Sequence, residues 1–199
     1  MIFKSKKEAL EKLLDVIEID KKNLLVLSIN KRGSFYAKEI ANKYKLFEDF
    51  LFIEEIKSPI NKDVSLGAVS EIKEYVLIDE FINSFEINND YIFSEAERVY
   101  EEKILKDIYN FRKGESIISL QNRNVLLVDE SINTGLSFLC AIKSCISKKV
   151  KNIKVAAPIA SKESAEFIKK LVDKTYFAYE IEDFINKDFY FKESKWVIL

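Results

Sequence analysis

The stretch 125–137 reads VLLVDESINTGLS, and it decides how the rest of the chain is interpreted. Four apolar residues of strand length precede two adjacent acids, Asp129 and Glu130, and a small polar turn around Gly135 follows them. Apolar residues then return at helical intervals in LSFLCAIKSCISKK. The stretch therefore predicts a buried strand, an acidic strand end and a helix that begins near Leu136.

The same alternation continues on both sides of this stretch. A hairpin is predicted from AVSEI and YVLID, after a long loop that carries Pro59 and Gly67. Apolar strands alternating with helices indicate an α/β fold, with a mostly parallel sheet flanked by helices, in a single domain spanning 1–199. The predicted strands are 23–29, 49–56, 152–159 and 175–181, and the predicted helices are 5–19, 35–44, 90–113 and 164–174.

Composition and charge exclude several classes of function. The net charge of −1 comes from 32 basic and 33 acidic residues, so no basic field predicts a nucleic-acid partner. Histidine is absent, which removes histidine-based catalytic triads and imidazole metal sites. Cys140 and Cys145 fit no metal-ligand spacing and are expected to be small core residues on a helix. No apolar run approaches the roughly 20 residues of a membrane span, so we expect a soluble, cytoplasmic protein without a membrane partner.

Two of the four glycines, Gly33 and Gly135, stand where a predicted strand ends and a helix begins. Ligands of open α/β sheets bind beyond this end of the strands. Glycine there allows a positive φ and a close approach of the backbone, so that successive N–H groups can surround an anion. The alternative is that both are only turn residues.

Three interpretations of VLLVDE compete. The strand is similar to the magnesium-carboxylate strand of nucleoside triphosphatases, but that chemistry needs an upstream G-x-x-x-x-G-K-[ST], and the chain has no Gly-Lys pair. It is also similar to the acidic strand end of a receiver domain, but those acids belong near the start of a fold. The third interpretation explains all thirteen residues.

In the third interpretation, Asp129 and Glu130 accept hydrogen bonds from a vicinal diol such as that of ribose. Backbone N–H groups, hydroxyls and the positive end of the following helix favour a phosphate dianion directly behind the acids. A diol and a phosphate one sugar apart describe a ribose 5-phosphate. The residues of the predicted phosphate loop are Ser131, Ile132, Asn133, Thr134, Gly135, Leu136 and Ser137.

With these residues the stretch resembles the phosphoribosyl pyrophosphate signature of type I phosphoribosyltransferases. INKRGS resembles the pyrophosphate loop of that family, with Lys31, Arg32, Gly33 and Ser34 as its working residues. The segments SPINKDVSLGAV, YNFRKG and IKVAAPIA extend the likeness, from about residue 6 to residue 191, to bacterial predicted phosphoribosyltransferases of unassigned substrate.

The resemblance implies a type I phosphoribosyltransferase-like fold with a small hood or flexible segment, within 56–115 and 180–199. It implies transfer of ribose 5-phosphate from phosphoribosyl pyrophosphate to a small nitrogenous acceptor, with release of pyrophosphate. Mg²⁺ would be carried by the substrate, with no direct protein ligand. The catalytic residues would be Asp129, Glu130, Lys31 and Arg32. Related enzymes are often dimers, so a homodimer is also expected.

Three positions depart from the family pattern. Glu130 replaces an aspartate, and Ser34 replaces a second glycine of the pyrophosphate loop. Asn133 stands where relatives that act on 6-oxopurines carry an aspartate base, which argues against purine salvage. The alternative function is therefore a catalytically degenerate regulatory protein that binds phosphoribosyl pyrophosphate or a nucleotide.

A mobile cover is expected to keep water from the reaction, and helix 90–113 and segment 57–64 are the candidates. Arg98, Lys103 and Arg112 are expected either to reach the pyrophosphate or to belong to a solvated helix face with a Glu102–Lys106 pair. Four aromatic residues are expected either to stack on a base or to lie in the core. They are Phe177, Tyr179, Phe184 and Phe189.

Overall fold

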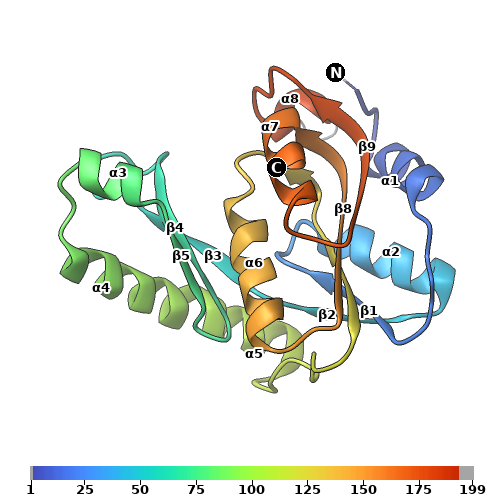
Figure 1. The fold of residues 1–199 in the computed structure, drawn as a ribbon, viewed down its shortest axis with the longest axis horizontal. Coiled ribbons are helices and arrows are strands. Elements are labelled where there is room, and N and C mark those ends of the chain that lie inside the picture. The colour runs from blue at the N-terminus through green and yellow to red at the C-terminus, as the bar shows by residue number, and fades with distance from the viewer. Residues whose placement is uncertain (1, 193–199) are drawn as a thin grey trace.

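The structure is a computed structural model, and it describes residues 2–192. Its main layer is a six-stranded sheet in which every pair of neighbouring strands is parallel. The strands run in the order β2, β1, β6, β8 and β9, and short β7 lies beside the second half of β8, on the side of β6 (Figure 1). Their bounds are β1 (Leu24–Ser28), β2 (Phe47–Phe50), β6 (Asn124–Val128), β7 (Ser131–Ile132), β8 (Asn152–Ser161) and β9 (Lys174–Ile181). The predicted α/β fold is confirmed.

Helices cover both faces of this sheet, as its apolar strands predict. Alternate side chains of β1 face opposite ways: Leu25 and Leu27 pack with α6 and α7, whereas Val26 packs with α1 and α2. Cys140 and Cys145 are buried in α6, as predicted, and burial raises the pKa of both thiols to about 12. The bounds are α1 (Lys6–Val16), α2 (Ser34–Tyr44), α6 (Leu136–Ser147), α7 (Lys162–Lys169) and α8 (Lys187–Tyr190). Within residues 2–192, no helix is long and apolar enough to cross a membrane.

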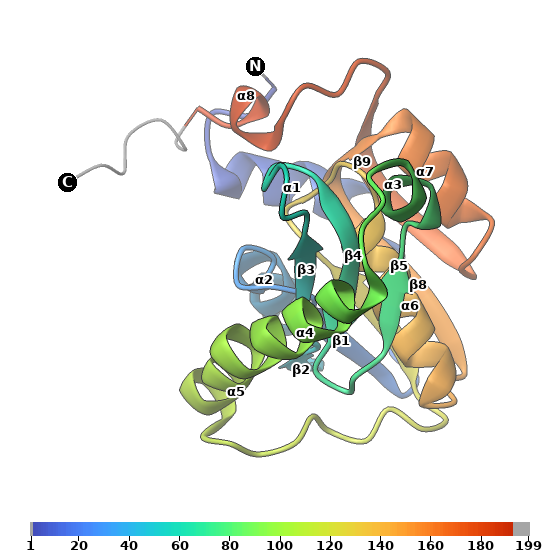
Figure 2. The ribbon, with the colours of Figure 1, turned by 90° about the vertical axis from the view of Figure 1, so that its left-hand side faces the viewer.

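Residues 53–112 form a unit with its own antiparallel sheet, of order β3, β4, β5, and we call this unit the hood. Figure 1 shows the hood beside α6, and Figure 2 shows its long helical run lying across its strands. Its elements are β3 (Ile53–Lys57), β4 (Ser65–Ser70), β5 (Tyr75–Leu77), α3 (Asp79–Ser84), α4 (Asn89–Val99), the π-helical segment η1 (Tyr100–Ile104) and α5 (Leu105–Arg112). A separate apolar cluster holds strands and helices together: Phe52, Ile56, Val69, Ala96, Val99 and Ile104.

The predicted single strand 49–56 is wrong, because the chain changes sheets within it. Leu51, just beyond the end of β2, still donates its N–H to the carbonyl oxygen of Ser28 in β1, and Ile53 already pairs with Ser70 of β4. Leu51 packs in the main core, whereas Phe52 packs in the core of the hood. The apolar pattern runs through the change without interruption, so periodicity could not reveal it.

Three further differences lie in the hood. Gly67 belongs to β4 rather than to a loop, and a Cβ at this position would collide with the carbonyl oxygen of Val76. Helix α3 was not predicted. The predicted helix 90–113 is present as α4, η1 and α5 in succession, and the predicted hairpin is the β4–β5 pair. The range 180–199 was the second one predicted to contain a hood or flexible segment. Its residues 193–199 lie outside the described part of the chain.

Candidate functional site

Two loops leave the carboxyl edge of the main sheet side by side. Strands β1 and β6 pair in parallel register from Leu24 opposite Asn124 to Ser28 opposite Val128, so the loops that follow them start next to each other. A pocket of about 350 Å³ opens between these loops and the segment before α8. Its lining includes Asn30, Arg32, Glu55, Asp129 to Phe138, Phe184, and Asn186 to Asp188.

Asp129 directly follows Val128, the last residue of β6, and is almost fully buried. Its Oδ2 accepts a hydrogen bond of 2.5 Å from the Asn30 side chain, and its Oδ1 accepts one of 2.6 Å from the backbone N–H of Glu130. Burial raises the pKa of the Asp129 carboxyl to about 6, although both hydrogen bonds favour the ionised form. Each oxygen keeps a lone pair for a ligand hydroxyl. Sequence analysis missed Asn30, which binds from the neighbouring loop.

Glu130 is only 4% exposed, and two lysines from opposite ends of the chain hold it. Lys6 Nζ, at the start of α1, lies 3.0 Å from Oε1, and Lys187 Nζ, at the start of α8, lies 3.5 Å from Oε2. A buried carboxylate needs such partners, because an unpaired charge would be costly. Neither lysine was predicted as part of the site.

The loop after Glu130 is braced from behind by α7. The hydroxyls of Ser161 and Ser164 donate to the carbonyl oxygen of Asn133 at 2.6 and 2.5 Å. Because C=O and N–H point in opposite directions across a trans peptide, this turns the N–H of Thr134 away from α7. The braces on the Asn133 carbonyl were also missed by sequence analysis.

Helix α6 begins directly behind this loop. Gly135 is its N-cap, with φ +75°, and makes no side-chain capping bond. The first N–H groups of a helix have no partner within it, and here the only cap is a 3.4 Å bond from Leu136 N–H to Thr134 Oγ1 within the described chain. The positive φ predicted for Gly135 is confirmed, and the loop lines the pocket.

The loop after β1 differs from its prediction in the backbone angle of Gly33 and in the partner of its N–H groups. Gly33 has φ −67°, so a positive φ is not what requires glycine. A Cβ there would lie 2.7 Å from the carbonyl oxygen of Val128 and 2.8 Å from Asp129 Cα, so glycine permits the contact between the two loops. The N–H groups of Arg32 and Gly33 donate to Asn30 Oδ1 at 2.9 and 3.0 Å. Ser34 donates its hydroxyl to the Lys31 carbonyl at 2.7 Å.

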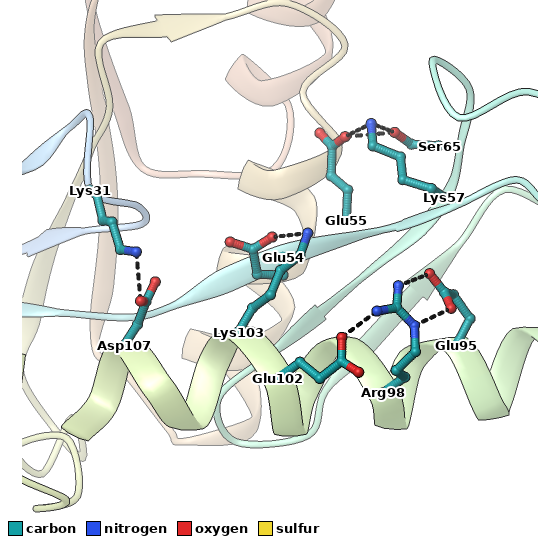
Figure 3. A network of polar contacts seen from close by, with 10 residues as sticks. All are labelled: Lys31, Glu54, Glu55, Lys57, Ser65, Glu95, Arg98, Glu102, Lys103 and Asp107. Atoms are coloured by element: carbon teal, nitrogen blue, oxygen red, sulfur yellow. Dashed lines mark hydrogen bonds and ion pairs between the residues drawn. The ribbon is translucent and has the colours of Figure 1, made fainter. Parts of the chain in front are cut away.

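A second pocket of about 510 Å³ lies between this loop and the hood, and it shares Asn30, Arg32, Glu55 and Ser137 with the first. Each lysine that lines it is paired with an acid, as Figure 3 shows. The pairs are Lys31 with Asp107 at 2.6 Å, Lys103 with Glu54 at 3.2 Å and Lys57 with Glu55 at 2.6 Å. The two pockets thus adjoin through these shared residues, and the cations of the second pocket are largely balanced by acids of the same pocket.

Comparison with solved structures identifies the architecture. The protein TT1426 of Thermus thermophilus has 24% sequence identity and a TM-score of 0.75, with 96% of this chain and 91% of that chain covered. A hypoxanthine-guanine phosphoribosyltransferase of Bacillus anthracis has 14% identity and a TM-score of 0.51, with 92% and 85% covered. The chain has the type I phosphoribosyltransferase fold.

Curated relatives agree with this phosphoribosyltransferase fold, although no protein-family model matches the chain. A Mycobacterium tuberculosis protein named "Putative phosphoribosyl transferase Rv0571c" is 23% identical over 142 residues. The match covers 71% of this chain and 32% of the relative, so the chain spans about a third of the curated protein's length.

Within this phosphoribosyltransferase fold, the three basic residues of the predicted cover helix lie in different surroundings. Lys103 lines the second pocket. Arg98 binds Glu95 through two nitrogens, and its third nitrogen binds Glu102, which therefore does not pair with Lys106. Arg112 is buried at the base of the hood, in contact with Glu71 and 3.7 Å from Asp49. The expectation that Arg112 reaches the pyrophosphate is wrong, because its guanidinium faces these two acids and lines neither pocket of the cleft.

The four aromatic residues that were expected to stack on a base or to lie in the core also have different surroundings. Phe177 packs against the main core, Tyr179 lies edge-on to Phe3, and Phe189 lies edge-on to Tyr190. Phe184 is the one of the four that lines the first pocket. It is therefore the aromatic residue placed to contact a ligand.

Proposed function

We propose that this chain binds phosphoribosyl pyrophosphate with Mg²⁺ and transfers its ribose 5-phosphate to a small nitrogenous acceptor, with release of pyrophosphate. One observation carries the proposal. The buried acid Asp129 and the start of α6, whose N-cap is Gly135, line the same pocket of about 350 Å³. Such a pocket would offer a carboxylate to the ribose diol and a helix N-terminus to the phosphate.

The 5-phosphate would bind in the loop 131–137. The N–H groups of Thr134 and Gly135 and the hydroxyls of Thr134 and Ser137 would donate to its oxygens, next to the positive end of α6. Gly135 leaves the N-cap open because it has no side chain. This phosphate lies away from the reacting carbon and would fix the position of C1.

The ribose diol would bind the two acids. Asp129 would accept from the diol with the lone pairs that Asn30 and Glu130 leave available. Glu130 would contribute through a carboxylate already held by Lys6 and Lys187. The diol contact thus rests mainly on Asp129.

The pyrophosphate would bind in the second pocket. Lys31 and Arg32 would stabilise the charge that collects on the leaving group as the bond to C1 breaks, in the segment that also carries Gly33 and Ser34. Lys31 is paired with Asp107 in this structure, so binding exchanges that partner for a phosphate oxygen. The N–H groups of Arg32 and Gly33 already donate to Asn30 Oδ1, so the side chains of Lys31 and Arg32 would make the contact with pyrophosphate.

A magnesium ion would arrive with the substrate. Magnesium is commonly held by one or two carboxylates together with substrate phosphates, and Asp129 is the acid nearest the proposed ribose. The bound ion would neutralise charge on the pyrophosphate.

The acceptor would enter beside Phe184, in the part of the pocket that also contains Asn186 and Lys187. Asn133 lines the same pocket and has no proton-accepting carboxylate, which disfavours 6-oxopurines. The reaction would take place in the cytoplasm, and a homodimer remains a prediction.

Isothermal titration with phosphoribosyl pyrophosphate and Mg²⁺, followed by a pyrophosphate-release screen against bases and amines, tests the function. Binding with release for one acceptor is the expected result. Binding without release would favour a sensor of phosphoribosyl pyrophosphate or a nucleotide, for which the engagement of Glu130 by two lysines is the supporting observation. No binding would exclude both functions.

A further inference from the structure

Glu55 of β3 lies where three pockets of the cleft meet. It lines the first pocket together with Asp129, and it lines the second together with Lys31. It also lines a third pocket, of about 470 Å³, below α4 and η1, which contains Arg98. Among residues 2–192, Glu55 is the one acid shared by these three pockets, and it approaches the site from the hood.

One oxygen of the Glu55 carboxylate is fixed and the other is available. Oε2 accepts hydrogen bonds of 2.6 Å from both Lys57 Nζ and Ser65 Oγ, and Lys57 Nζ also donates to Ser65 Oγ at 2.8 Å. Figure 3 shows Oε1 pointing away from both partners. Within residues 2–192, Oε1 makes no hydrogen bond, so it is oriented without being satisfied.

The carboxylate of Glu55 is ionised at neutral pH. Burial opposes its ionisation, but the hydrogen bonds from Lys57 and Ser65, together with the charge of Arg32, lower the pKa of Glu55 below its ordinary value. A carboxylate of this kind is a weak base. Its contribution to a reaction would be negative charge at a fixed place.

The residues common to the first two pockets mark where the broken bond would lie, since ribose 5-phosphate would fill one and pyrophosphate the other. Within the described part of the chain they are Asn30, Arg32, Glu55 and Ser137, and Glu55 is the one acid of this set. We propose that Glu55 is a catalytic residue of the transfer, whose Oε1 faces ribose C1 and stabilises the positive charge that develops there. This inference rests on the proposed function.

The bond changes balance without proton transfer to Glu55. The C1–O bond breaks and its electron pair leaves with pyrophosphate, while the acceptor nitrogen supplies the pair of the new C1–N bond and loses its proton to water. Asp129 and Glu130 are less suited to the charge at C1, since the pKa of Asp129 is raised and Glu130 is paired with two lysines. Glu55 adds a free oxygen on the opposite, hood side.

The inference is tested by comparing two ligands that differ in charge at the ring. The ring of ribose 5-phosphate is uncharged, whereas the ring nitrogen of 1,4-dideoxy-1,4-imino-D-ribitol 5-phosphate is protonated and positively charged. Glu55→Gln is expected to weaken the cationic analogue roughly tenfold in titration calorimetry, the effect of one lost ion contact, and to change ribose 5-phosphate by less than about twofold. Glu74→Gln is the matched control, because Glu74 is also paired with a lysine, Lys143, but lines none of the three pockets.

A second variant guards against misfolding of the first. Ser65→Ala keeps the charge but removes one anchor of Oε2, and a smaller loss confined to the cationic analogue is expected. Equal effects of Glu55→Gln on both ligands, or no effect on the analogue, would overturn the role of Glu55 while leaving the proposed function in place. Failure of the unaltered protein to bind either ligand would overturn both.

Discussion

Lys31 Nζ lies 2.6 Å from the carboxylate of Asp107, a buried residue of the hood helix α5. A side chain of the hood therefore holds the cation that the proposed chemistry assigns to pyrophosphate. The ion pair joins the hood to the loop after β1, and pyrophosphate must compete with Asp107 for the same ammonium group. The strength of that competition can be measured.

Replacing Asp107 with asparagine is expected to tighten binding of magnesium pyrophosphate. Lys31 is 56% exposed, so the ion pair is worth only about 1 kcal/mol, and a gain of roughly fivefold in affinity follows. Titration calorimetry measures it, with Glu102→Gln on the same helical run as the control. Weaker binding in Asp107→Asn would mean that Asp107 positions Lys31 rather than competing for it.

Gly33→Ala is expected to disrupt both loops at once. A Cβ at position 33 would lie 2.7 Å from the Val128 carbonyl oxygen, so the loop must move away from Asp129, at a cost of about 1–3 kcal/mol. Affinity for ribose 5-phosphate should fall with stability. Gly114→Ala is the contrast: Gly114 has φ +91°, and a Cβ there would meet no atom of a non-neighbouring residue within 4 Å, so stability should fall by about 1–2 kcal/mol with unchanged binding. Unchanged binding in Gly33→Ala would contradict the account of the loop contact.

The braces behind the phosphate loop give a third prediction. Ser161→Ala with Ser164→Ala removes both donors to the Asn133 carbonyl, so the Thr134 peptide loses the orientation that presents its N–H to the pocket. Affinity for ribose 5-phosphate should fall about tenfold, while affinity for pyrophosphate stays the same. Equal losses for the two ligands would indicate a general disturbance of the fold.

Asp129 gives a prediction on pH. The pKa of its carboxyl is about 6 in the folded protein against 3.8 ordinarily, so the folded state disfavours the ionised form. The cost is nearly absent at about pH 3 and nearly complete at about pH 7, where it reaches about 3 kcal/mol. The free energy of unfolding of the unaltered protein minus that of Asp129→Asn should fall by this amount between about pH 3 and pH 7.5. Denaturant titrations at both pH values measure the difference, and parallel behaviour would contradict a raised pKa.

Ligand binding should depend on pH in the opposite direction to stability. Only the ionised carboxylate of Asp129 offers its lone pairs to both hydroxyls of a diol, so affinity for ribose 5-phosphate should rise as the pH increases through about 6. In Asp129→Asn this part of the pH dependence should disappear. A rise that persists in the variant would assign it to another group.

Most of the fold could be predicted from the sequence, because the local patterns of apolar, acidic and glycine residues agree with the contacts that these residues make in the structure. The apolar strand, acidic end and helix start of 125–137 appear as β6, the loop and α6, and the glycines mark the two loops of the site. The change of sheet at Leu51 and Phe52 could not be predicted, because both sheets accept the same alternation of side chains. Pattern identifies a strand, but not its partner.

The candidate site was predicted where its residues form a continuous stretch of sequence. Asp129 and the loop 131–137 form one such stretch, and Lys31 to Ser34 form another. Lys6 and Lys187 reach Glu130 from 124 and 57 residues away, and neither lies in a motif. Asn30 and Glu55 are similarly placed by the parallel pairing of β1 with β6 and by the position of the hood.

A crystal structure of the protein with ribose 5-phosphate tests the central claim most directly. The account predicts the phosphate within hydrogen-bond distance of the N–H groups of Thr134 and Gly135, and the ribose diol on the carboxylate of Asp129. A ribose 5-phosphate bound elsewhere, with the loop 131–137 empty at saturating ligand, would contradict it.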